Sequence, residues 1–283
     1  MTWQFLILIS VFLYSISVLL QKTLLKPKQS DPIAFSILFQ ILTGIIIGLF
    51  GFLISSMTFP NLKPLLPNLI LMTLFYGFGS IFLFKALKKI EASKFTIIFS
   101  SRALFTILAS SIILNEVLTL KQYLGTLLII LGVIIANIKA DKLTFTKNEA
   151  TALLAAVCFG LAITNDKFLL ETFTVYPYVT TAFIIPGLFV ALLNPGKTSK
   201  ITQLLQFKTL PKILLLCIIY ASSAIAFYFA LQISNNSSQI ASINLTSIIV
   251  IVLLAIIFLK ERNNLAPKIL GAISSFIGLL LVS

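Results

Sequence analysis

The chain has 283 residues, of which 59% are apolar and 10% are charged, and its mean hydropathy is +1.09. Soluble domains carry roughly 25% charged residues, so this composition excludes a soluble protein. The formal net charge is +13, but the basic residues lie between long apolar runs that hold most of the aromatic residues. This arrangement does not indicate a nucleic-acid partner. It indicates a chain embedded in a lipid bilayer.

Apolar runs of nearly constant length recur along the chain. A helix that crosses a hydrocarbon core of about 30 Å needs about 20 apolar residues. Clusters of Pro, Gly, Asn and Lys, which are typical of loops, separate the runs. They predict ten transmembrane helices, over residues 3–21, 32–54, 66–87, 92–114, 122–138, 150–168, 176–193, 211–232, 237–259 and 266–283. The runs lack the polar alternation of barrel strands, so we expect an all-α integral membrane protein.

The two halves of the chain, residues 1–140 and 149–283, each contain five of these spans. Landmark residues recur between the halves at separations of 144 to 146 residues. The charged and glycine pairs carry most weight, namely Lys22 and Lys167, Glu116 and Glu261, Gly125 and Gly271, and Gly132 and Gly278. Because five is an odd number, the second half would enter the bilayer from the opposite side. The sequence therefore predicts two inverted five-helix repeats, with a substrate site near the midplane between them.

A glutamate followed by a glycine-spaced helix ends each half. The segments are Leu114-Asn115-Glu116-Val117-Leu118-Thr119 with Gly125 and Gly132, and Leu259-Lys260-Glu261-Arg262 with Gly271 and Gly278. In these segments the chain resembles the ten-helix EamA-type branch of the drug/metabolite transporter superfamily. The resemblance implies a transporter fold and role, and it names no substrate. That family often carries a proline near the middle of helices four and nine, and neither span has one here.

Arg102 lies near the middle of the predicted span 92–114. An arginine at the bilayer centre costs roughly 2.5 to 3.5 kcal/mol on insertion scales, so it should face the interior of the bundle and have a partner. We expect no acidic residue at its depth. The guanidinium either bonds structurally, to backbone carbonyls or to Asp166 or Glu116 at a helix end, or receives a carboxylate or phosphate of a substrate.

Other polar side chains inside the predicted spans are candidates for lining a central cavity. They are Gln40, Tyr76, Asn165, Tyr220, Tyr228 and Asn244. The alternative for each is a hydrogen bond between helices. The chain has no His, no acid pair spaced for metal chemistry and no phosphate-binding loop, so we expect neither an enzyme, nor a metal site, nor a bound cofactor.

Gly44, Pro186 and Gly187 are candidates for hinges or gates, because interrupted helices at matching places in two inverted halves point to the moving parts of transporters. Lys22 and Lys167 either extend toward the membrane surface or contribute to a gate. Glu116 and Glu261 are expected to anchor a loop or the N-terminus of a neighbouring helix.

Seventeen of the 21 Lys and Arg residues lie in odd-numbered loops and three in even-numbered loops. Cytoplasmic loops are enriched in these residues, so the distribution places both termini outside the cytoplasm. The EamA-type pattern usually has both termini inside, so the resemblance implies the opposite orientation. Both orientations stay open.

These features predict a secondary transporter of the plasma membrane that moves a small anionic or zwitterionic solute by alternating access. A metabolite or amino-acid exporter or exchanger fits this description, as a monomer or homodimer, with a possible coupling ion because no nucleotide-binding motif is present. The alternative is a membrane protein that does not transport, such as a lipid-handling or complex-scaffolding subunit.

Overall fold

The computed structural model describes residues 3–55, 57–114, 119–139, 142–143, 145–206, 209–233, 244 and 246–282. The long helices are α1 (Trp3–Leu25), α2 (Pro32–Ile54), α3 (Leu66–Lys89), α4 (Ala92–Ser100), α5 (Arg102–Leu114), α6 (Leu120–Ala136), α7 (Lys147–Leu170), α8 (Val175–Leu193), α11 (Leu210–Ile233), α13 (Ser247–Phe258) and α14 (Leu265–Val282). The short elements are the 3-10 helix Lys63–Leu65, strands β1 (Ile138–Lys139) and β2 (Lys142–Leu143), and helices α9 (Pro195–Thr198) and α10 (Ile201–Leu204).

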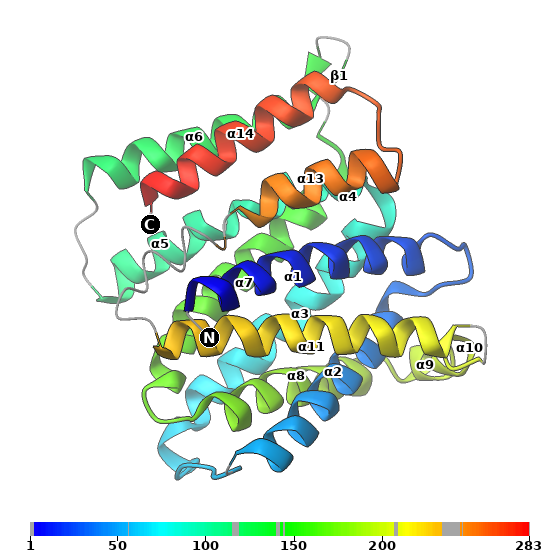
Figure 1. Ribbon diagram of the computed structural model, residues 1–283, viewed down its shortest axis with the longest axis vertical. Coiled ribbons are helices and arrows are strands. Elements are labelled where there is room, and N and C mark those ends of the chain that lie inside the picture. The colour runs from blue at the N-terminus through cyan, green and yellow to red at the C-terminus, as the bar shows by residue number, and fades with distance from the viewer. Residues whose placement is uncertain are drawn as a thin grey trace.

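The helices follow the predicted spans closely. Apart from the ninth span, each predicted boundary lies within four residues of a helix boundary. In the described part of the chain, seven stretches are long and apolar enough to cross a membrane, and α6, α13 and α14 are shorter apolar helices. Both termini lie on one side of the bundle, and α9, α10 and β1 lie on the opposite side (Figure 1).

The prediction of one continuous helix over residues 92–114 is wrong, because α4 ends at Ser100 and α5 begins at Arg102. The Ser100 and Ser101 hydroxyls donate to the carbonyls of Ile97 and Ile98, at 2.6 and 2.7 Å. Serine hydroxyls that bond to the preceding turn compete with the main chain and bend helices. A break therefore forms without proline or glycine.

The second half begins a helix at the corresponding place. Helix α13 starts at Ser247, which is 145 residues after the first residue of α5, Arg102. Residues 234–243 and 245, which make up most of the first part of the predicted ninth span, lie outside the described residues. The first residues of α5 and α13 are thus as far apart in the sequence as Lys22 and Lys167, one of the residue pairs that indicated the repeat.

Glycines allow two pairs of helices to approach closely. Where α2 crosses α8, a Cβ at Gly44 would lie 2.6 Å from Ile184 Cγ1, and a Cβ at Gly187 would lie 3.0 Å from Ile41 Cγ1. Gly44 and Gly187 therefore form a close crossing next to Pro186, inside α8. Helices α6 and α14 also lie side by side (Figure 1).

Charged side chains tie helix ends together on the side of the odd-numbered loops. Glu261, after α13, accepts hydrogen bonds from the backbone N–H groups of Ala92 and Ser93 at 2.7 and 2.9 Å and from the Ser93 hydroxyl at 2.6 Å. As expected, this glutamate holds the N-terminus of a neighbouring helix. Its predicted counterpart, Glu116, lies outside the described residues.

Similar contacts complete a set that we call the polar belt. Its members are Lys22, Asp31, Lys88, Glu91, Lys94, Glu149, Lys197, Lys200, Glu261 and Lys268. Burial alone would raise the pKa of the Asp31 carboxyl, but hydrogen bonds from Lys197, from the Ile33 and Ala34 amides and from Lys200 lower it below its usual value. Asp31 is thus ionised while it caps α2.

Candidate functional site

A central cavity of about 650 Å³ lies among the helices of both halves. Ligand pockets typically enclose about 300 to 1,000 Å³, so this cavity has room for a small metabolite. Six of the seven predicted substrate-binding residues line it, namely Gln40, Tyr76, Arg102, Tyr220, Tyr228 and Asn244. The side chains come from α2, α3, α5 and α11 and from Asn244, so distant parts of the sequence build one chamber.

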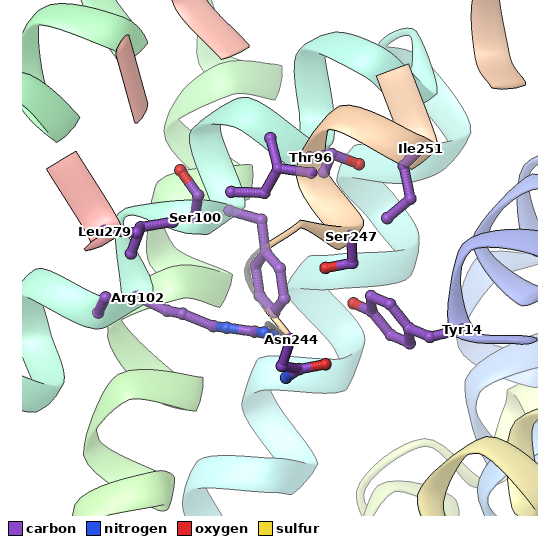
Figure 2. A pocket seen from close by; sticks show the side chains of 11 residues that line it. Tyr14, Thr96, Ser100, Arg102, Asn244, Ser247, Ile251 and Leu279 are labelled. Atoms are coloured by element: carbon purple, nitrogen blue, oxygen red, sulfur yellow. The ribbon is translucent and has the colours of Figure 1, made fainter. Parts of the chain in front are cut away.

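Arg102, the first residue of α5, lines both this cavity and a small adjoining pocket of about 40 Å³. Its side chain extends toward Asn244 (Figure 2), and its guanidinium carbon lies 4.8 Å from the centre of the Phe99 ring. Within the described part of the chain, the guanidinium forms no ion pair and no hydrogen bond. Ser100 and Ser247 also line the pocket, so the starts of α5 and α13 meet there.

Asp166 lines the same cavity as Arg102, although no acid was expected at the depth of Arg102. The carboxylate is 6% exposed, and its Oδ2 accepts a hydrogen bond of 2.5 Å from the Tyr76 hydroxyl. Helix α7 continues to Leu170, so Asp166 lies a full turn before the helix end. Asp166 shares one face of α7 with Phe159 and Ile163, which also line the cavity.

Hydrogen bonds fix the wall of the cavity on the α2 and α3 side. The Gln40 amide donates to the hydroxyls of Ser80 and Ser36 at 2.9 and 3.1 Å, and Ser80 donates to the carbonyl of Gly77 at 2.8 Å. The amide group of Gln40 is therefore held by its own helix and by α3, while the side chain remains part of the cavity wall.

Aromatic rings form much of the remaining wall. Tyr220 contacts Phe39, Phe183 and Tyr14 edge to face, with ring centroids 5.0, 5.7 and 6.1 Å apart. Tyr228 packs in the same manner on its neighbour Phe227 at 5.4 Å. Such rings give an apolar chamber with a few polar groups, which is typical of sites for small organic ligands.

The remaining predicted residues lie elsewhere. Asn165 does not line the cavity; its amide donates to the carbonyl of Asn68 at 2.8 Å, which ties α7 to α3. Successive helix residues point about 100° apart, and of this adjacent pair Asp166 lines the chamber while Asn165 faces α3. The Lys22 ammonium donates to the carbonyls of Leu87, at 2.7 Å, and Ile90, at the end of α3. The Lys167 side chain lies outside the described residues.

A comparison with protein families decides what kind of protein this is. The EamA-like transporter family matches residues 1–138 and 147–283, which together are nearly the whole chain. The chain belongs to the EamA-like transporter family. Like other members, this EamA-like protein is therefore a multi-pass membrane transporter of the drug/metabolite type, and the predicted all-α membrane fold is confirmed. Membership also agrees with the expectation that it is not an enzyme.

Comparisons with curated proteins and with solved structures add less information about the EamA-like protein. No curated protein matches it. A solved structure described only as "Crystal structure of protein" superposes with a TM-score of 0.68 at 12% identity, over 99% of this chain and 96% of the other. At this identity the likeness shows a shared fold. The substrate has to be argued from the cavity of this chain.

Proposed function

We propose that the protein is a secondary transporter that moves a small anionic or zwitterionic metabolite across the plasma membrane by alternating access. The solute occupies the central cavity, and its carboxylate or phosphate binds Arg102. Export or exchange of the solute fits this arrangement. The observation that carries the proposal is the Arg102 guanidinium, which faces the cavity without an ion pair or hydrogen bond in the described residues.

The chemistry of arginine supports an anionic solute. A guanidinium offers five N–H donors in a planar fork that matches carboxylate and phosphate oxygens. A charge at this depth in a membrane protein is costly without a partner, and contact with the Phe99 ring compensates only part of that cost. An anion from the solute would supply the missing partner, so Arg102 favours anionic and zwitterionic solutes over cations.

The two helix starts support the location of the site. Secondary transporters with inverted repeats often bind substrate where helices are interrupted at the midplane, with helix N-termini directed at anionic groups. Helices α5 and α13 begin at Arg102 and Ser247, and both residues line the small pocket. The alternative of a membrane protein that does not transport finds no support in the family match.

Counterflow into proteoliposomes tests the proposal. The purified protein is screened for exchange of radiolabelled amino acids, organic acids and sugar phosphates, with cationic drugs as the comparison class. We expect exchange of at least one anionic or zwitterionic solute, partial loss in Arg102→Lys and loss in Arg102→Gln. Lys89→Gln, which removes an exposed lysine, is the matched control and should exchange normally. Exchange of cationic drugs alone, or normal exchange by Arg102→Gln, would overturn the proposal.

A further inference from the structure

Asp166 is a second charged side chain of the cavity to which the proposed function gives no role. It is 6% exposed, and its two carboxylate oxygens have different surroundings. Oδ2 accepts the hydrogen bond from Tyr76. Oδ1 is buried beside the Tyr178 hydroxyl, and neither of these two atoms has a hydrogen-bond partner of ordinary geometry among the described residues, with which Asp166 also forms no ion pair. An ionised carboxylate rarely persists in such a place without a counter-charge.

The groups around Asp166 are phenols, and the cavity also contains one cation, Arg102, with which Asp166 forms no ion pair. Tyr76 on α3, Tyr178 on α8 and Tyr228 on α11 face the carboxylate. Helix α5 contributes Arg102 to the cavity wall, and we assign the guanidinium of this residue to binding of the solute. The single charged residue of α4, Lys94, pairs with Glu149 at 2.7 Å near the other end of α7. No described basic side chain therefore neutralises Asp166.

We propose that Asp166 is the proton-binding site through which this transporter couples solute movement to a proton gradient, an inference that rests on the proposed transport function. A proton requires a single oxygen, and Oδ1 supplies one. A metal ion requires several oxygen ligands at once, and the described residues contain no cluster of three acidic or sulfur ligands. The geometry therefore points to a proton rather than a sodium or calcium ion.

The step is a simple proton transfer. When the cavity is open to one side of the membrane, water donates a proton to Oδ1 and an O–H bond forms; when it is open to the other side, that bond breaks and water accepts the proton. Tyr76 remains bonded to Oδ2 throughout and positions the carboxyl group. A neutral Asp166 removes the unpaired charge while the cavity changes its access, which is the stage at which burial is greatest.

Labelling with dicyclohexylcarbodiimide tests this without knowledge of the solute. This apolar reagent forms a stable adduct with protonated carboxyl groups in membrane interiors. We expect an adduct on the peptide that contains Asp166, detected by mass spectrometry, with a yield that falls as the pH is raised. Glu261 is the internal control, since it is equally buried at 7% exposed but both of its carboxylate oxygens already accept hydrogen bonds, three in all. Its peptide should remain unlabelled.

Three results would overturn the proposal: no adduct on Asp166 at any pH at which the protein stays folded, a yield independent of pH, or protection by sodium at constant pH. Because the wild-type protein carries its own control, the test does not depend on the folding of a variant. Tyr76→Phe should extend labelling to higher pH, since the phenol stabilises the ionised form. Loss of labelling with intact counterflow would refute the proton site alone, whereas absence of counterflow with intact labelling would refute the transport proposal.

Discussion

In the polar belt, each charged side chain meets an opposite charge or the backbone of a helix end or adjoining loop. In the central cavity, by contrast, Arg102 and Asp166 form no ion pair with any described residue. Glu261 accepts three hydrogen bonds, and Lys268 pairs with Glu91. Among the described residues, Arg102 contacts the Phe99 ring without a hydrogen bond, and Asp166 accepts from the Tyr76 hydroxyl and lies beside the hydroxyl of Tyr178. Burial alone therefore does not distinguish the two regions. They differ in whether their buried charges are compensated by hydrogen bonds and ion pairs.

The difference separates stability from function. Paired charges at helix ends hold the helices in place, and removing one partner leaves the other buried and uncompensated. A cavity charge without a partner adds little to the stability of the fold, and it is available to a solute or a proton. We therefore expect belt variants to lose stability first and cavity variants to lose transport first.

The largest effect should come from Arg102→Gln, which would separate the two regions most clearly. Loss of a charged hydrogen-bonding partner of the solute should weaken binding by about 3 kcal/mol, or roughly 100-fold. The thermal unfolding temperature in detergent should change little, because the guanidinium forms no ion pair or hydrogen bond with the described residues. Counterflow and thermal unfolding measured on the same preparation check this. A large fall in unfolding temperature would make Arg102 a structural residue.

Glu261→Ala should show the opposite behaviour. It leaves the Ala92 and Ser93 amides without their acceptor, and unsatisfied buried donors should lower the free energy of unfolding by about 2 kcal/mol or more. Unfolding in denaturant measures this, with Glu171→Ala, an exposed acid at the end of α7, as control. Equal stability of both variants would contradict the structural role of the belt.

Gly160→Ala tests the position of a cavity charge, because it should displace Arg102 without removing the guanidinium. A Cβ at Gly160 would lie 2.6 Å from the carbonyl oxygen of Arg102, so α5 must shift. Overpacking of this kind costs about 1 to 3 kcal/mol, and we expect the apparent KM of transport to rise. Gly196→Ala is the matched control, since nothing lies within 4 Å of its Cβ. An unchanged KM would mean that the position of Arg102 does not set solute affinity.

The sequence predicted most helices well and the faces of those helices less well. Hydropathy over about 20 residues detects a membrane span, and most spans therefore agree with the structure. The break at Ser101 was missed because it depends on two serine hydroxyls that bond backward to Ile97 and Ile98. Such a contact changes neither the hydropathy nor the length of the apolar run.

The cavity residues also show that hydropathy locates a span but does not tell which side chains face inward. Arg102 could be selected from the sequence because charge inside a span is rare. Asp166 was assigned to a helix end because its predicted span stopped at residue 168, two residues before the end of α7. Both Asn165 and Asp166 are polar and adjacent, so composition cannot tell which one faces inward. Which of the two side chains faces the cavity depends on how α7 is rotated about its axis, and packing against the neighbouring helices sets that rotation.

The smallest effect is expected at Asn165, and it tests that assignment of helix faces. Asn165→Ala removes one hydrogen bond, from the amide to the Asn68 carbonyl, and bonds between membrane helices contribute about 0.6 kcal/mol on average. The unfolding temperature should fall slightly, and counterflow should match wild type because the side chain does not line the cavity. Asp166→Asn, one residue along the same helix, should leave stability equal or higher while carbodiimide labelling disappears. If Asn165→Ala instead impaired transport with unchanged stability, α7 would present Asn165 to the solute, and the pairing of Asp166 with Tyr76 at the cavity wall would have to be abandoned.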